Sequence, residues 1–215
     1  MPAPAPQAGI PLWLKIGFSC WVLLWALSYW HLYGPFNYFW LCNIANFLIL
    51  LGLWRESRLL LSAQCLAVLL IGMVWTLDVA VAFVTGGVDG WHLIGGTEYM
   101  FDPEIPLAGR LLSLYHSFLP LVALYGVYRV GYDRRGIHVQ TLITAVLLIV
   151  TWLVVDPELN INWVHAPFGA EEQELLPPPL YLVAVIVATP VLLYLPSHFL
   201  IRGLLAALGN RQRDQ

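Results

Sequence analysis

Six long apolar stretches, separated by short breaks, constrain this chain more than any other feature of its sequence. A helix needs about 20 predominantly apolar residues to cross the hydrocarbon core of a membrane. Stretches of roughly that length occupy residues 11–30, 36–54, 59–84, 106–130, 138–155 and 178–202. The sequence therefore predicts an all-α integral membrane bundle of six transmembrane helices, which forms a single domain over residues 1–215.

The composition agrees with a membrane protein. Hydrophobic residues make up 60% of the 215 residues and charged residues 11%, whereas a soluble domain is about 25% charged. Such a chain has too few polar groups to cover its own apolar surface. The N-terminus carries no positive cluster before the first apolar stretch, so we expect the first helix to be retained. We predict a multi-pass protein of a bacterial inner membrane or of another cellular membrane.

The basic residues are divided unevenly between the breaks. If the N-terminus is cytoplasmic, nine of the ten basic residues fall on the cytoplasmic side and only Arg110 falls on the other, outer side. An excess of Lys and Arg marks the cytoplasmic side of membrane proteins. Both termini are therefore predicted to be cytoplasmic. Because the basic residues are spread over separate loops, they form no continuous patch, and this excludes nucleic-acid binding.

Ionisable and amide side chains at membrane depth are candidates for function, because they are costly there. At 1.5 Å per residue, Cys42 and Asp78 lie roughly 10 Å below the outer ends of their segments, and His116 lies roughly 15 Å below its own. Asn43 adjoins Cys42, and Asn46 lies one turn deeper. These residues are therefore predicted to share one depth in the outer half of the membrane.

The spacing of these residues suggests nucleophilic chemistry. Cys42 and Asn46 are four residues apart and so share one helix face, as do Ser113 and His116 at a spacing of three. A thiol beside an imidazole is the minimum for an activated nucleophile, and Asp78 or Asn46 would orient the ring.

Purely structural roles also explain the same residues. A buried Cys is usually a small hydrophobe, and Asn in a membrane helix often bonds a neighbouring helix. Asp78 would then form an ion pair or bond an interfacial tryptophan such as Trp75.

Three histidines lie on the predicted outer side, namely His31, His92 and His165, together with nine carboxylates. Imidazole and carboxylate groups suit zinc, manganese or non-haem iron. No HExxH or comparable spacing is present, and a solvated acidic surface explains the same residues. We predict no metal site and no cofactor.

Three stretches, FWLCNIANFLILLGL, LYHSFLPLVAL and NINWVHAPFG, resemble in order and spacing the six-helix membrane family of the androgen-induced-gene hydrolases and the related transmembrane acyltransferase-like proteins. The resemblance covers residues 38–168. In that family a Thr or Cys on an early helix is the nucleophile, a His on a later helix is its partner, and fatty-acyl esters are cleaved or transferred within the membrane. The resemblance implies Cys42 as nucleophile and His116 as general base. It also likens the segment with Asn162 and Trp163 to the stretch before the family's last helix.

The leading hypothesis is an intramembrane lipid acyl hydrolase or acyltransferase with a Cys-His pair in the outer half of the bilayer, acting on a lipid ester. Its catalytic residues would be Cys42, His116 and Asp78. Its substrate-binding residues would be Asn43, Asn46, Ser113, Asn162, Trp163 and His165. The sequence indicates no particular oligomeric state.

The alternative is a non-enzymatic membrane subunit or a small-molecule or cation-binding membrane protein, in which the acidic outer loops 86–105 and 156–177 make the contacts. A carrier that uses Asp78 and His116 is disfavoured, because the chain shows no repeated halves with broken helices.

Overall fold

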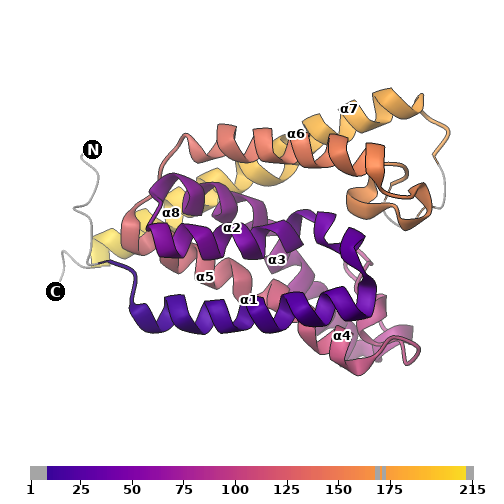
Figure 1. Ribbon diagram of the computed structural model, residues 1–215, viewed down its shortest axis with the longest axis horizontal. Helices are drawn as coiled ribbons and strands as arrows, with labels where there is room; N and C mark the ends of the chain where they lie inside the picture. The colour runs from indigo at the N-terminus through magenta and orange to yellow at the C-terminus, as the bar shows by residue number, and fades with distance from the viewer. Residues whose placement is uncertain (1–8, 168–169, 171–172, 212–215) are drawn as a thin grey trace.

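The computed structural model describes residues 9–167, 170 and 173–211, and all regular elements within these residues are helical. The α-helices run back and forth along one long axis (Figure 1). They are α1 (Leu12–Tyr33), α2 (Leu41–Arg55), α3 (Arg58–Thr85), α4 (Leu107–Ser113), α5 (Tyr115–Val130), α6 (Gly136–Val154), α7 (Pro178–Thr189) and α8 (Leu195–Arg211). The shorter turns are η1 (Pro35–Phe39), η2 (Gly87–Asp89), η3 (Glu98–Met100), η4 (Pro157–Leu159), η5 (Ile161–Trp163) and the π-helical turn η6 (Pro190–Tyr194).

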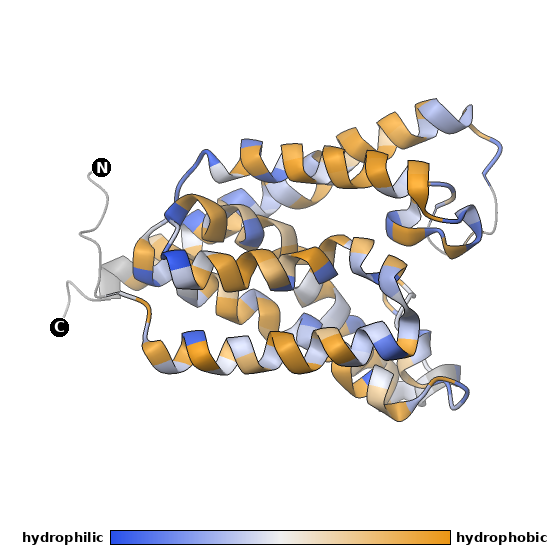
Figure 2. Cartoon of the chain, in the orientation of Figure 1, coloured by the Kyte–Doolittle hydropathy of each residue, from blue (hydrophilic) through white to orange (hydrophobic). Residues whose placement is uncertain are grey.

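Five helical segments are long and apolar enough to cross a membrane: Leu12–Tyr33, Arg58–Thr85, Leu107–Val130, Gly136–Val154 and Pro178–Leu208. They correspond to five of the six predicted spans. The third joins α4 and α5, and the fifth joins α7, η6 and α8. Hydrophobic residues predominate along these segments (Figure 2). These segments are compatible with a multi-pass membrane protein.

The second predicted span is shorter than expected. The helix α2 has 15 residues, which at 1.5 Å per residue is about 22 Å, less than the roughly 30 Å of a hydrocarbon core. Gly34, at φ 76°, ends the run from α1. Pro35 then opens the 3-10 turn η1, and Trp40, at ψ 134°, separates that turn from α2. The backbone therefore turns at residues 34–40, and α2 begins only at Leu41. The hydropathy pattern predicts a helix from residue 36.

The helix α3 is the centre of the bundle. It contacts α2, α5, α6, η6 and α8, and its buried residues include both polar and apolar side chains. The larger core cluster joins α1, α2, α3 and α5 around Trp25, Ile49, Leu66 and Tyr115. A smaller cluster joins α6, the 156–167 loop and α7 through Leu148, Val164 and Leu182.

A buried hydrogen-bond network attaches α6 and η6 to α3. Gln64 on α3 donates to Gln140 on α6 at 2.9 Å, and Gln140 donates to Thr144 at 3.3 Å. Thr144 in turn bonds the Tyr194 hydroxyl at 2.5 Å. All four residues are at most 1% exposed. Because lipid provides no hydrophobic force between helices, such bonds help to hold a membrane bundle together.

The helices α3 and α5 pack closely at Gly72. A Cβ atom there would lie 2.5 Å from Pro120 Cγ and 2.6 Å from the carbonyl oxygen of His116. Both distances are too short for a real side chain. The absence of a side chain at Gly72 therefore sets how closely the two helices pack.

We expect Gly72→Ala to destabilise the fold by about 1–3 kcal/mol, the usual cost of overpacking a close-packed core. Thermal unfolding of the purified protein in detergent measures this. Gly17→Ala on α1 is the matched control, because a Cβ there meets no atom within 4 Å and alanine favours a helix over glycine by roughly 1 kcal/mol. Equal melting temperatures for Gly72→Ala and Gly17→Ala would contradict the close contact.

Candidate functional site

The two residues predicted as a nucleophile and its base line one small cavity between α2, α3 and α5. Its lining consists of Cys42, Val68, Ile71, Gly72, His116, Leu119 and Pro120. The cavity has a volume of about 10 Å³, which is at the lower limit for a single water molecule. The structure therefore brings Cys42 and His116 to one cavity that is too small for a lipid.

A break in the helix fixes the imidazole of His116. Around Leu114, where α4 ends and α5 begins, Ser117 N–H bonds the carbonyl of Leu114 at 3.0 Å instead of that of Ser113. The Ser113 carbonyl accepts from His116 Nδ1 at 2.8 Å. A carbonyl only accepts, so Nδ1 carries the proton and Nε2 keeps its lone pair. The group that orients the ring is thus the Ser113 carbonyl. The sequence suggests Asp78 or Asn46 for this role.

Two aromatic rings stack on the imidazole of His116. The His116 ring stacks on Tyr115 at 4.0 Å between centroids and on Trp75 at 4.9 Å, with interplanar angles of 28° and 25°. Ring packing of this kind restricts the imidazole to one orientation. His116 is therefore a pre-positioned group, whose Nε2 is the nitrogen available to a partner.

The Cys42 thiol has an amide oxygen within hydrogen-bond reach. Cys42 Sγ lies 3.9 Å from Asn43 Oδ1, and the same oxygen accepts from the Tyr115 hydroxyl at 2.5 Å. Asn43 Nδ2 donates to the Asn37 carbonyl at 2.7 Å. Because an amide oxygen is not a base, the thiol keeps its proton in this arrangement.

Asn46 connects helices and does not line the cavity. Its Nδ2 donates to the Cys42 carbonyl at 3.3 Å, and its Oδ1 accepts from Trp21 Nε1 at 3.2 Å. The bond to Trp21 joins α2 to α1. Asn46 therefore has the structural role that is common for an asparagine in a membrane helix, a hydrogen bond to a neighbouring helix.

A group of hydroxyls surrounds Ser113 beside the site. The Tyr29 hydroxyl and Ser113 Oγ are 3.0 Å apart, and Ser113 Oγ donates to the Gly109 carbonyl at 3.1 Å. Tyr99, in η3, lies beside Ser113 and Trp75, and burial raises its pKa to about 12. Sequence reasoning missed Tyr29, Tyr99 and Tyr115, because tyrosines in such segments look like an interfacial aromatic belt.

The buried carboxylate of Asp78 fastens the 86–105 loop to α3. Asp78 is 0% exposed. It accepts from the backbone N–H of Ile94 at 2.9 Å and from the Thr97 hydroxyl, and His92 Nδ1 lies 3.4 Å from it. These bonds direct Asp78 toward the loop, so the structure does not place it as the partner of His116.

The 156–167 loop fastens to the start of α2 through Asn162. Its Oδ1 accepts from Leu41 N–H at 2.9 Å, and its Nδ2 donates to the Phe39 carbonyl at 2.7 Å. Asn162 and Trp163 have φ angles of 57° and 55°, which is the left-handed region that a bulky residue such as Trp rarely adopts. The Trp163 ring packs against Trp40 at 5.5 Å. Neither residue lines the cavity.

His165 lies in the same loop and is also separate from the cavity. Its ring stacks on Trp152 at 6.3 Å between centroids, and burial lowers its pKa. Three or more His, Cys, Asp or Glu side chains in an arrangement able to hold a metal ion do not occur among the described residues.

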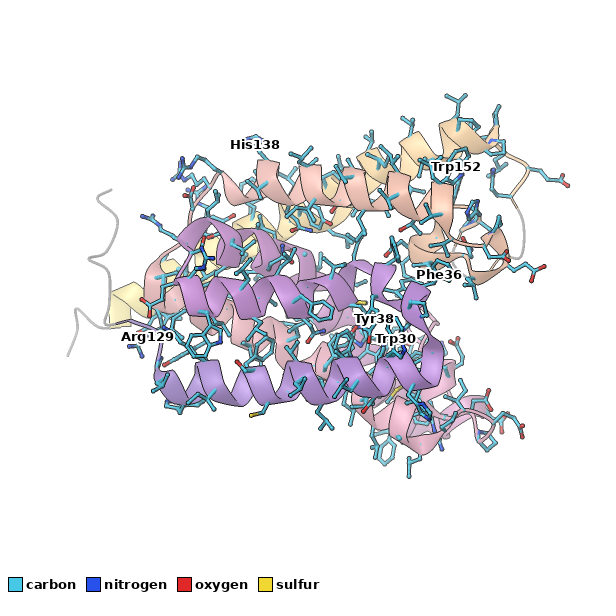
Figure 3. All side chains as sticks on the ribbon, viewed as in Figure 1. Trp30, Phe36, Tyr38, Arg129, His138 and Trp152 are labelled. Atoms are coloured by element: carbon cyan, nitrogen blue, oxygen red, sulfur yellow. The ribbon has the colours of Figure 1, made fainter. Side chains whose placement is uncertain are left out.

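Four labelled aromatic side chains and Arg129 lie toward opposite ends of the bundle (Figure 3). Trp30, Phe36, Tyr38 and Trp152 lie toward the end that carries the 86–105 and 156–167 loops, and Arg129 lies at the end where α1 begins (Figure 3).

No family model matches this chain, and neither the curated proteins nor the solved structures yield a match.

We expect Asp78→Asn to release the 86–105 loop, because the amide replaces one accepting oxygen by a donor that faces the Ile94 N–H or the Thr97 hydroxyl. An unpaired buried polar group costs about 1–3 kcal/mol, so chymotrypsin should cleave at Trp91, Tyr99 or Phe101 several times faster than in the unmodified protein. Mass spectrometry of timed digests identifies the cuts. The matched control is Asp89→Asn, which changes an exposed carboxylate of the same loop. Unchanged cleavage rates in Asp78→Asn would show that the carboxylate does not hold the loop.

Proposed function

We propose that this chain is an intramembrane lipid acyl hydrolase or acyltransferase, with Cys42 as the nucleophile and His116 as the general base. The observation that carries the proposal is the shared cavity, which Cys42 and His116 both line. A second support is the bond from His116 Nδ1 to the Ser113 carbonyl, which leaves Nε2 free to take a proton. The resemblance to acyl-ester enzymes of the membrane points to the same pair.

In the proposed reaction, His116 Nε2 takes the thiol proton of Cys42, directly or through one water in the cavity. The thiolate attacks the carbonyl carbon of a lipid ester, the bond to the alcohol breaks, and His116 returns the proton to the leaving oxygen. Water or an acceptor alcohol then attacks the thioester, His116 takes its proton, and the thiol is restored. The Tyr115 hydroxyl, beside both side chains, is a candidate donor to the developing oxyanion.

The cavity must widen before an ester enters it. Its volume is about 10 Å³, and the Gly72–Pro120 contact forms one wall. Access from the outer end of the bundle would require the 86–105 loop or the outer part of α5 to move. Under this proposal, the hydrogen bonds between Asp78 and the 86–105 loop control how often the cavity opens.

The test is a trapped acyl-enzyme. The chain in nanodiscs is incubated with phospholipids that carry labelled acyl chains, and intact-protein mass spectrometry detects a hydroxylamine-sensitive adduct. Cys42→Ala should abolish the adduct, and His116→Ala should slow its formation by about 10²–10⁴-fold, the usual contribution of a general base. Cys20→Ala is the matched control, because Cys20 is an exposed thiol on α1. An adduct that persists in Cys42→Ala, or no adduct in the unmodified chain, would overturn the proposal.

A non-enzymatic membrane subunit is the second candidate function. One observation favours it: the Cys42 thiol faces the Asn43 amide in an enclosed apolar space, which is also how an unreactive buried thiol packs. The acidic outer loops would then contact a partner or a small molecule. In that case Cys42→Ala leaves the protein's function intact, and substitutions in the 86–105 and 156–177 loops impair it.

We also propose six spans with both termini cytoplasmic, in which η1 and α2 together form the second span. Support comes from Asn162, which holds the start of α2 at the end of the bundle where the 156–167 loop lies. Arg55 and Arg58 follow at the opposite end, where the positive-inside rule places the cytoplasm.

We expect Asp89→Cys and Glu158→Cys, in a cysteine-free background, to react with a membrane-impermeant maleimide in intact cells. Arg134→Cys should react only after the cells are permeabilised. All three positions are exposed in the structure, so accessibility depends on the side of the membrane alone. The reverse pattern would invert the orientation, and labelling of all three in intact cells would reject the membrane topology.

A further inference from the structure

Three arginines from three different elements lie close to Tyr132, at the end of the bundle where α1 and α3 begin (Figure 1). Arg58 begins α3, Arg134 lies between α5 and α6, and Arg202 is on α8. Arg58 donates to the Tyr132 carbonyl at 2.9 Å. Arg134 follows Tyr132 by two residues, and Arg202 lies one helical turn beyond His198, whose ring nitrogen bonds the Tyr132 hydroxyl.

The local backbone brings these groups together. Gly131, at φ 92°, has no side chain, and a Cβ there would lie 3.2 Å from Arg58 Nε. Arg58 can therefore lie directly against the chain. The Tyr132 hydroxyl bonds His198 Nδ1 at 2.7 Å, which joins the loop to α8. Arg202 is four residues beyond His198 and so lies on the same helix face.

Asp133, which adjoins Arg134 in the chain, forms its ion pair with Arg135. Asp133 bonds Arg135 through both of its oxygens, at 3.1 Å to Nε and 2.8 Å to an η-nitrogen. This pairing lowers the pKa of Asp133. Among the described residues, the ion pairs of this structure do not include Arg58, Arg134 or Arg202. All three side chains are exposed, so their charges are available to an anion.

We propose that Arg58, Arg134 and Arg202 form a binding site for the phosphate of an anionic phospholipid headgroup. Guanidinium groups bind phosphate oxygens in a two-point geometry, and basic pockets between membrane helices bind such headgroups. The apolar surface next to the site selects a lipid over free phosphate. Phe199 and Leu195 are 59% and 44% exposed on α8, at spacings of three and four residues that continue from Arg202 along one face. A phosphate at Arg202 would leave its acyl chains along these side chains.

The test uses the full chain in nanodiscs of phosphatidylcholine alone or with one third phosphatidylglycerol. Native mass spectrometry after detergent extraction counts the lipids that stay bound. The unmodified chain should retain phosphatidylglycerol in preference to phosphatidylcholine. The double variant Arg134→Gln/Arg202→Gln should lose about 25-fold in that preference, at roughly fivefold for each basic residue. This variant keeps the Arg58 bond to Tyr132, and its melting temperature in phosphatidylcholine alone checks that it folds.

The control is Arg55→Gln, which removes an exposed arginine at the same end but outside the site, and it should change the preference by less than the double variant does. Equal retention of phosphatidylglycerol by the double variant and the unmodified chain would overturn the proposal. An equal loss in Arg55→Gln would also overturn it, because it would indicate a general basic surface. Inorganic phosphate that stabilises the chain as strongly as phosphatidylglycerol does would assign the site to free phosphate and reject the lipid.

Discussion

The close contact between α3 and α5 at Gly72 is the constraint on which the rest of the bundle depends. Pro120 has no N–H to offer the carbonyl of His116, and Gly72 packs against that carbonyl and the proline ring at distances that exclude any side chain. With α5 this close, Trp75 on α3 reaches the His116 ring and stacks on it. The same contact leaves the small cavity beside Cys42. Packing at one glycine thus determines both the position of the imidazole and the size of the space beside it.

Hydrogen bonds between polar side chains join several pairs of helices in this protein. The Gln64–Gln140 bond links α3 to α6, the Tyr115–Asn43 bond links α5 to α2, and the Trp21–Asn46 bond links α1 to α2. Lipid tails are as apolar as leucine, so burial of leucine alone does not favour one helix pairing over another. Such hydrogen bonds select specific neighbours. A polar residue at membrane depth therefore has a structural purpose here before it has a chemical one, as Asn46 illustrates.

The sequence predicts the long spans well, because a run of apolar residues in lipid has to be helical. The prediction from sequence fails at residues 36–40. These residues are mostly apolar, but Gly34 and Pro35 turn the backbone before them, and a hydropathy pattern does not report such a turn. The number of residues from the outer end of each span predicts that Cys42 and His116 lie at one depth. In the structure both residues line one cavity. The sequence does not predict the Ser113 carbonyl as the partner of the ring, since that bond exists only because the helix breaks at Leu114. Nor does it reveal that Asp78 binds a loop 16–19 residues ahead of it, because loop paths leave no periodic pattern.

The Asn43 amide holds the Cys42 thiol in an arrangement that differs from the one the proposed reaction needs. Its amide oxygen accepts from the Tyr115 hydroxyl and faces the Cys42 thiol at 3.9 Å, and Tyr115 stacks on His116. A thiol is a weak donor, so the Cys42 contact costs little to break, whereas the tyrosine hydroxyl is a stronger donor and holds the amide in place. A rotation of the thiol toward the cavity would exchange an acceptor that cannot take a proton for the lone pair on His116 Nε2. The barrier to activating Cys42 would then lie less in breaking its present hydrogen bond than in opening α3 from α5 far enough to admit a substrate.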